Sequence, residues 1–143
     1  MEIRKAHPGD RELIVKLDHV ATHEKDRAAF IKRAINSGAC FVCTESGRIR
    51  GYGALEYSFY ENGFISMVYA DADRRRQGIG SVLLRAMEEH CTTPKLFTST
   101  NQTNVPMQLL LQRLGYVESG IIFNLDPGDP ELIYFKQLRQ DAA

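Results

Sequence analysis

The stretch from Cys40 to Ala70 constrains this chain most, because it has the composition of strands and no helical spacing. Cys40–Glu45 is apolar and β-prone, and Ile49–Tyr60 continues as a long run rich in aromatic residues. Glu61-Asn62-Gly63 is a strong hairpin signal before a third run, Phe64–Ala70. The sequence therefore predicts an antiparallel meander of three strands.

Helical and strand patterns alternate on both sides of this meander. A short strand, Ile3–Ala6, precedes apolar residues at helical spacing over Asp10–Ala21 and Lys25–Asn36. The elements expected after the meander are a helix over Val82–His90, a strand Lys95–Thr100, a helix from about Pro106 to Leu114, and strands Tyr116–Leu125 and Leu132–Leu138. This order predicts a mixed α/β (α+β) fold, with about four helices on the faces of one mostly antiparallel sheet of six to seven strands.

Length and composition fit an ordinary globular chain. With 143 residues, of which 43% are hydrophobic, we expect residues 1–143 to form a single domain. Lys plus Arg equals Asp plus Glu at 18 each, and this balance argues against a nucleic-acid partner. No apolar run reaches membrane-spanning length, and the first residues lack the apolar stretch of a secretory signal. We therefore expect a cytoplasmic protein without a membrane partner.

The cysteines and histidines do not form a metal motif. Cys40 and Cys43 are three apart on one expected strand, so their side chains point to opposite faces, and no second pair completes a zinc site. His19 and His23 have helical i, i+4 spacing without an evident third ligand. We expect no metal, and the odd count of three cysteines suggests no disulfide framework.

Gly78 and Gly80 lie between a strand and a helix, where the backbone can approach a ligand closely. The free N–H groups of a helix start accept phosphate well, and Arg74, Arg75 and Arg76 add full positive charges. A tight turn with a solvated basic rim explains the same residues. The spacing matches neither a P-loop nor a dinucleotide-binding G-x-G-x-x-G.

In this segment the chain resembles the GNAT superfamily of acetyltransferases. The family motif Arg/Gln-x-x-Gly-x-Gly/Ala is matched by Arg75-Arg76-Gln77-Gly78-Ile79-Gly80, after a strand Val68-Tyr69-Ala70 where the family often has Leu-Tyr-Val. Asn104 and Gly115-Tyr116 match a second signature, in which Asn starts a helix and Gly-aromatic follows its end. The expected order of elements fits the family over nearly the whole chain.

The resemblance implies acetyl-coenzyme A as the acetyl donor. It assigns the diphosphate to a cradle of Gln77, Gly78, Ile79, Gly80 and Ser81, with Arg75 and Arg76 on the phosphates. Strand Val68–Ala70 would splay from strand Lys95–Thr100 to admit the pantetheine arm, and an amide at or near Val68 would face the thioester oxygen. Asn104 would bond this arm or hold the strand-to-helix loop.

The chain departs from the family pattern at the general acid. Many members have a Tyr seven residues after the Asn, and here that position is Leu111, which cannot donate a proton. Tyr116, Tyr134 or a water could take its place. Our catalytic candidates are Tyr134 for this acid and Glu56 for the base, although Glu56 also fits a solvent-facing charge on its strand.

Together these features predict an N-acetyltransferase that moves an acetyl group directly to a primary amine in a ternary complex. The acceptor is a small molecule or a protein amine, and a homodimer remains open. The alternative is a non-catalytic acyl-coenzyme A-binding sensor, which Leu111 favours. Asp129 and Glu131 either attract a cationic amine or build a turn.

Overall fold

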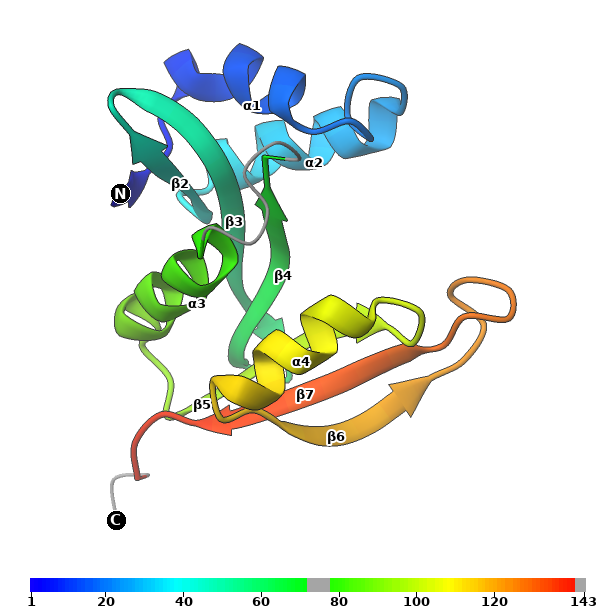
Figure 1. Ribbon diagram of the computed structural model, residues 1–143. Coiled ribbons are helices and arrows are strands. Elements are labelled where there is room, and N and C mark those ends of the chain that lie inside the picture. Colours follow the sequence, from blue (N-terminus) through cyan, green and yellow to red (C-terminus); the bar gives the residue numbers. More distant parts are fainter. Residues whose placement is uncertain (72–77, 141–143) are drawn as a thin grey trace. The chain divides into compact units, whose positions relative to one another are not determined.

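The computed structural model describes residues 1–71 and 78–140. Its elements, in chain order, are β1 (Glu2–Lys5), a short 3-10 helix (Pro8–Asp10), α1 (Arg11–Leu17), α2 (Lys25–Asn36), β2 (Cys40–Glu45), β3 (Arg48–Phe59), β4 (Asn62–Ala70), α3 (Ile79–His90), β5 (Lys95–Asn101), α4 (Val105–Arg113), β6 (Val117–Ile122) and β7 (Glu131–Gln137) (Figure 1). The chain has two compact units. Unit 1 comprises Met1–Leu55 and Met67–His90, and unit 2 comprises Glu56–Ser66 and Cys91–Ala143.

The strands are hydrogen-bonded in the order β1-β2-β3-β4-β5-β7-β6. Strands β1, β2 and β3 pair antiparallel, as do β5, β7 and β6. The pairing of β4 with β5 is parallel and runs from Gly63 opposite Leu96 to Ile65 opposite Thr98. The predicted fold class, a mixed and mostly antiparallel sheet with four helices, is confirmed.

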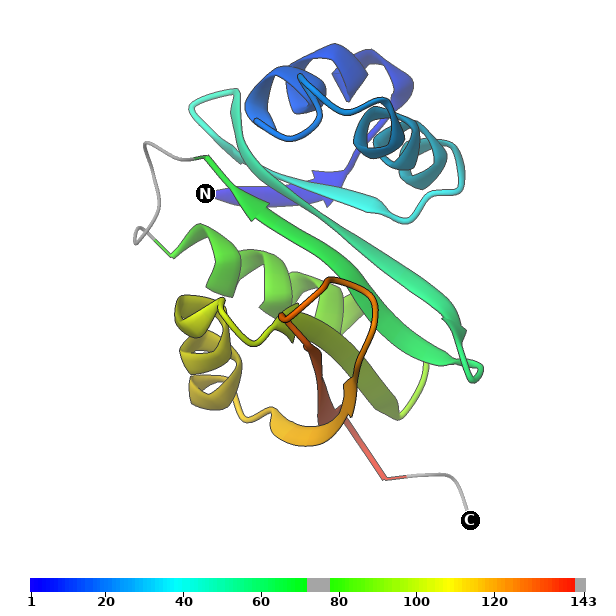
Figure 2. The same cartoon turned by 90° about the vertical axis from the view of Figure 1, so that its right-hand side faces the viewer.

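Unit 1 has helices on both faces of its strands (Figure 2). On one face, Ile14 of α1 and Ile31 of α2 form a core with Val42 and Tyr52. Helix α3 packs closely against the opposite face of these strands. A Cβ atom built on Gly53 would lie 2.7 Å from Met87 Cε of α3 and 2.9 Å from the Met67 carbonyl oxygen, so a larger residue would force the neighbouring atoms to shift.

Helix α1 is shorter than expected. It ends at Leu17 rather than near Ala21, because the carboxylate of Asp18 accepts hydrogen bonds from the amides of Val20 and Ala21. These bonds close a turn and compete with the next helical turn. The expectation that His19 and His23 share a helix face is therefore wrong.

Unit 2 has α4 on one face of β5 and β7 (Figure 1). Leu111 of α4 and Tyr116, just after the helix, are buried. The ammonium of Lys136 on β7 lies 5.4 Å from the centre of the Tyr116 ring. The even-numbered side chains of this part of β7 therefore face α4, and the odd-numbered ones face away from it.

Candidate active site

The end of β4 carries the residues predicted to lie along the pantetheine arm of acetyl-coenzyme A. These residues, Val68, Tyr69 and Ala70, are all half-buried. The Tyr69 hydroxyl accepts a hydrogen bond of 3.1 Å from the amide of His19. The guanidinium of Arg27 lies 3.3 Å from Met67 Sδ. The loop after α1 is thus held against the last residues of β4.

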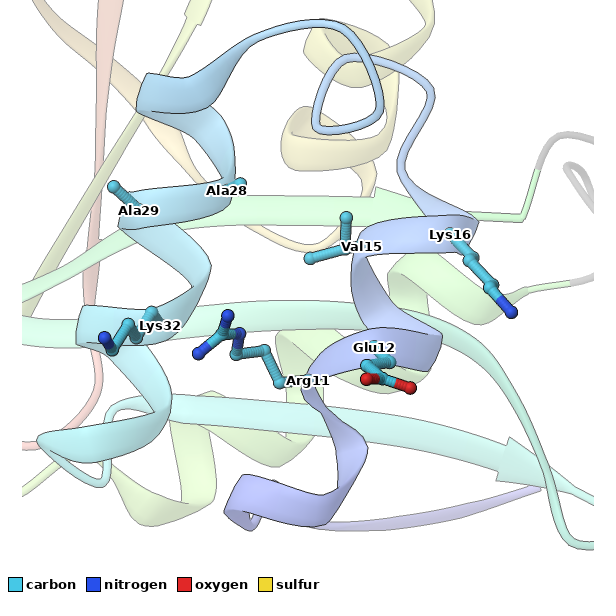
Figure 3. Close-up of a pocket in the computed structure, with 7 residues that line it drawn as sticks. All are labelled: Arg11, Glu12, Val15, Lys16, Ala28, Ala29 and Lys32. Atoms are coloured by element: carbon cyan, nitrogen blue, oxygen red, sulfur yellow. The ribbon is translucent and has the colours of Figure 1, made fainter.

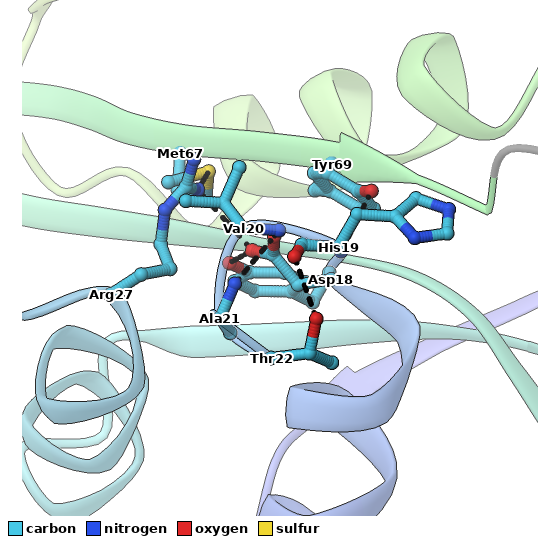
Figure 4. Close-up of polar contacts among 9 residues, drawn as sticks. Asp18, His19, Val20, Ala21, Thr22, Arg27, Met67 and Tyr69 are labelled. Carbon is cyan, nitrogen blue, oxygen red and sulfur yellow. Dashed lines mark hydrogen bonds and ion pairs between the residues drawn. The ribbon is translucent and has the colours of Figure 1, made fainter. Parts of the chain in front are cut away.

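A buried carboxylate, Asp18, organises this loop (Figure 4). It has no exposed surface and accepts hydrogen bonds from the Tyr52 hydroxyl, the amides of Val20 and Ala21, and Arg27 at 3.2 Å. Burial, and then the bond to Asp18, raises the pKa of the Tyr52 phenol well above its usual value. The sequence analysis missed this network, because its partners lie far apart along the chain.

The start of α3 supplies the backbone of the predicted phosphate cradle. Gly78 is exposed with φ +83, and its carbonyl accepts the first helical bond, from Val82 N, at 2.9 Å. Ile79 is buried, while Gly80 and Ser81 are half-buried in the first turn. The first amides of a helix have no partner within it, so they carry partial positive charge. Arg75, Arg76 and Gln77 lie outside the described residues.

Asn104 is the N-cap of α4. Its side-chain oxygen accepts a hydrogen bond of 3.3 Å from Met107 N, and its own amide donates to Asn101 O at 3.0 Å. These two bonds join the end of β5 to the first turn of α4. Contact with a pantetheine arm remains a prediction.

Tyr134, the candidate acid, lies on β7 with no exposed surface. Its hydroxyl has no hydrogen-bond partner among residues 1–71 and 78–140. Tyr134 is paired with Thr98 of β5, whose hydroxyl donates to the Ile65 carbonyl at 2.8 Å. Ser66, the residue after Ile65, has a buried hydroxyl that likewise finds no partner in the described chain. Unit 2 thus has two buried hydroxyls without a partner, those of Ser66 and Tyr134, and both lie next to Ile65 and Thr98, the last paired residues of β4 and β5.

Two other predicted positions have contrasting environments. Leu111 is 1% exposed and is part of the core of unit 2. Its aliphatic side chain has no proton to donate. Glu56 lies on β3 and is half-buried. Its role as a base stays a prediction, as does its alternative as a surface charge.

The acidic residues before and at the start of β7 build the turn. Asp129 accepts hydrogen bonds from Thr103 N at 3.0 Å and Thr103 Oγ1 at 2.7 Å. Glu131 accepts one of 2.6 Å from the Ser99 hydroxyl. Of the two interpretations given for Asp129 and Glu131, these bonds support the structural one.

A cavity of about 370 Å³ lies between α1 and α2 (Figure 3). Val15, Ala28 and Ala29 contribute its apolar lining, and Arg11, Glu12, Lys16 and Lys32 contribute charged groups. A second cavity of about 470 Å³ extends from α1 to Asp71, just beyond β4. Neither cavity is lined by a residue that the sequence analysis placed in the active site.

The described residues contain no group of three or more His, Cys, Asp or Glu side chains that could hold a metal ion. Cys40, Cys43 and Cys91 are buried free thiols, and burial raises the pKa of Cys40 to about 12. No helix in the described ranges is long and apolar enough to cross a membrane.

Comparison with protein families gives a match to the acetyltransferase (GNAT) family over residues 10–116. The chain belongs to the GNAT family. A GNAT acetyltransferase from Bacillus cereus ATCC 10987 is 34% identical, with 95% of this chain and 96% of that chain covered and a TM-score of 0.89. The resemblance noted in the sequence is therefore confirmed.

Two more distant structures share the fold. YncA, a putative acetyltransferase from Salmonella typhimurium solved with acetyl-CoA, is 20% identical, with 100% of this chain and 96% of that one covered and a TM-score of 0.80. An aminoglycoside 6'-N-acetyltransferase complexed with coenzyme A is 13% identical, with both chains covered completely and a TM-score of 0.82. A search of curated proteins gave no match.

Proposed function

We propose that this GNAT protein is an N-acetyltransferase that moves an acetyl group from acetyl-coenzyme A to a primary amine by direct transfer in a ternary complex. The observation that carries the proposal is the glycine turn that opens α3, in a chain whose family membership rests on residues 10–116. Solved relatives with acetyl-CoA or coenzyme A bound support the choice of donor.

Acetyl-coenzyme A supplies an activated acetyl thioester. In this proposal the amides of residues 77–81 hold its diphosphate, because the positive end of α3 and the exposed Gly78 leave room for a close approach. Arg75 and Arg76 neutralise the phosphates. The backbone of Val68–Ala70 pairs with the pantetheine arm and presents an amide to the thioester oxygen.

The transfer forms an N–C bond, breaks the C–S bond, and moves one proton from nitrogen to sulfur. An alkyl amine has a pKa near 10.4, so only roughly one molecule in two thousand is neutral at pH 7. A carboxylate, acting directly or through water, makes the amine nucleophilic. We assign this role to Glu56, which is half-buried on β3.

The leaving sulfur needs the proton that the family's usual tyrosine would give. We assign this step to Tyr134, because its buried hydroxyl has no partner within the part of the chain that the structure describes. A buried hydroxyl without a partner costs about 1–3 kcal/mol, and a bound ligand atom would recover that energy.

The acceptor is a small-molecule or protein amine. The fold cannot choose between them, because GNAT scaffolds accept both. We expect the protein to act in the cytoplasm as one domain, without metal, membrane or nucleic acid.

Release of coenzyme A from acetyl-coenzyme A across a panel of amines tests the proposal, alongside calorimetric titration with acetyl-coenzyme A alone. We expect binding, and turnover with at least one amine. Gly78→Val should abolish both, since its φ of +83 and its close approach to phosphate are unfavourable for a branched residue. Gly47→Val, at φ +78 in the β2–β3 turn, is the matched control for backbone strain.

The second candidate, a non-catalytic acyl-coenzyme A sensor, is favoured by the buried Leu111. Binding without turnover on every amine would select it. Both candidates would be excluded if the wild type gave no heat with acetyl-coenzyme A and Gly78→Val kept every activity that the wild type has.

The variant Tyr134→Phe tests whether Tyr134 gives the proton to the leaving sulfur. We expect kcat to fall by about tenfold or more, with the KM for acetyl-coenzyme A unchanged, because only the proton to sulfur is lost. Tyr60→Phe, at the 85% exposed hairpin tip of unit 2, is the control. An unchanged kcat in Tyr134→Phe would remove this residue from the mechanism.

A further inference from the structure

The cavity between α1 and α2 lies wholly within unit 1 and has a volume of about 370 Å³ (Figure 3). Pockets that hold small molecules span about 300–1,000 Å³, so this cavity suits a ligand at the small end of that range. None of the residues that we assign to acetyl-coenzyme A or to the acetyl transfer lines it. The cavity is therefore available to a second kind of ligand.

The two ends of this cavity differ in chemistry. Val15 of α1 and Ala28 of α2 line one end with apolar groups, and both are half-buried. The other end is lined by Arg11, about one helical turn before Val15, and by Lys32, about one turn after Ala28. Figure 3 shows the Arg11 side chain extending from α1 towards the helix that carries Lys32. A cavity of this kind fits a ligand with an alkyl body and an anionic head.

The charges of Arg11 and Lys32 are not compensated by a carboxylate. Neither side chain forms an ion pair with a residue in the ranges 1–71 and 78–140. Asp10, next to Arg11 in the sequence, is bonded to Arg4 instead. Within α1 and α2, the residues three and four positions from these two cations are uncharged: Ile14, Val15, Ala28, Ala29, Ile35 and Asn36.

The other two charged residues of the lining, Glu12 and Lys16, compensate each other. They are four positions apart on α1, with the glutamate first, which is the spacing and order at which opposite charges attract on one helix face. In Figure 3 the Lys16 side chain points away from α2. The uncompensated positive charge of the cavity is therefore that of Arg11 and Lys32.

We propose that this cavity binds a small carboxylate with a short alkyl chain. The planar guanidinium of Arg11 can donate two parallel hydrogen bonds to a carboxylate, and Lys32 adds a second positive charge. The alkyl chain lies against Val15, Ala28 and Ala29, and the removal of these apolar surfaces from water favours binding. The small alanine side chains leave the space that the chain occupies. The proposal does not rest on the proposed acetyl transfer.

The first test is a titration of the whole chain with octanoate, followed through the amide signals in NMR spectra. We expect a Kd of about 1 mM or tighter, with shifts in Arg11–Leu17 and Lys25–Asn36 and none in α4. Octan-1-ol lacks the charge and acetate lacks the chain, so each should bind at least about tenfold more weakly. The proposal is overturned if α1 and α2 show no saturable shifts, or if octan-1-ol binds as tightly as octanoate.

The cationic end is tested by two variants at exposed positions. Arg11→Gln and Lys32→Gln should each weaken octanoate binding by about tenfold, because each removes a charge-assisted contact with the carboxylate. Arg33→Gln is the matched control, since Arg33 is also exposed on α2 and does not line the cavity. Wild-type affinity in the Arg11→Gln, Lys32→Gln double variant would show that these charges do not hold the ligand and would remove the proposal.

The apolar end is tested by Ala28→Leu, whose added carbons fill the space meant for the alkyl chain. We expect a folded protein by circular dichroism and no detectable octanoate binding, whereas wild-type affinity would contradict the location. Gly78→Val, which should lose acetyl-coenzyme A, should bind octanoate with an unchanged Kd. Loss of octanoate from Gly78→Val would place the ligand in the coenzyme A site and refute a separate one. Since no measurement here uses acetyl-coenzyme A, failure of this proposal leaves the proposed function unaffected.

Discussion

The two units each bury one tyrosine completely, and the two hydroxyls have different surroundings. In unit 1, Tyr52 donates to Asp18, which also accepts from Arg27 and from two amides. In unit 2, the hydroxyl of Tyr134 has no partner in the described chain. The first arrangement stabilises the fold. The second costs stability, because a buried hydroxyl without a partner has lost its hydrogen bonds to water.

The largest expected effect comes from removing the carboxylate at the centre of the unit 1 network. Asp18→Ala would leave the Tyr52 hydroxyl and the partly buried Arg27 charge without their partner. We expect the free energy of unfolding to fall by about 3–5 kcal/mol, measured by urea denaturation. Glu89→Ala, at an exposed position on α3, should stay within about 0.5 kcal/mol. A loss below about 1 kcal/mol for Asp18→Ala would contradict this account of unit 1.

The two tyrosines can be compared directly. Tyr52→Phe leaves Asp18 short of one donor, so we expect a loss of about 1–3 kcal/mol in unfolding free energy. Tyr134→Phe removes a hydroxyl that has no partner, so stability should stay unchanged or rise slightly. Equal losses for both variants would mean that the Tyr134 hydroxyl is satisfied in solution, and the contrast between the units would disappear.

A smaller effect is expected at the second paired carboxylate of unit 1. The guanidinium of Arg4 binds Asp10 with distances of 2.7 and 3.0 Å, and this hydrogen bonding holds the pKa of Asp10 below its usual value. Because the folded pKa is lowered, the stabilisation is present above the unfolded pKa and is lost as pH falls through the folded value.

Arg4→Met should therefore lower the unfolding free energy at pH 7 by about 1 kcal/mol, a modest value because Arg4 is partly exposed. The difference between variant and wild type should shrink when urea denaturation is repeated at a pH acidic enough to protonate Asp10 in the folded protein. A difference that is the same at both pH values would assign the loss to packing of the Arg4 stem.

The smallest expected effect is a difference in how fast a thiol reagent labels two buried cysteines, Cys40 and Cys91. The pKa of Cys40, raised to about 12 by burial, keeps its thiol protonated and unreactive at pH 8. Cys40 lies in β2 between β1 and β3, whereas Cys91 directly follows α3 at the start of a segment of unit 2. We expect a thiol reagent to label Cys91 before Cys40 under native conditions. Faster labelling of Cys40 would show that β2 opens more readily than its pairing implies.

Local patterns predicted much of this structure. The bounds of α2 and β2 agree with the sequence analysis, because a helical apolar face and a continuous β-prone run are set by neighbouring residues. The Gly78 turn was found in the same way, since glycine at positive φ acts over a few residues. The Asn104 cap was expected from the family signature, and asparagine at a helix start is a local device of the same kind.

The sequence by itself therefore determined the order of elements, the fold class and the family. Only the tertiary structure decided which polar groups are satisfied and which apolar residues meet. Asp18 and Tyr52 are 34 positions apart. The register of four strands sets Phe64, Phe97, Phe135 and Val117 opposite one another. Such contacts depend on how distant segments pair and pack, so the spacing of residues along one element does not reveal them.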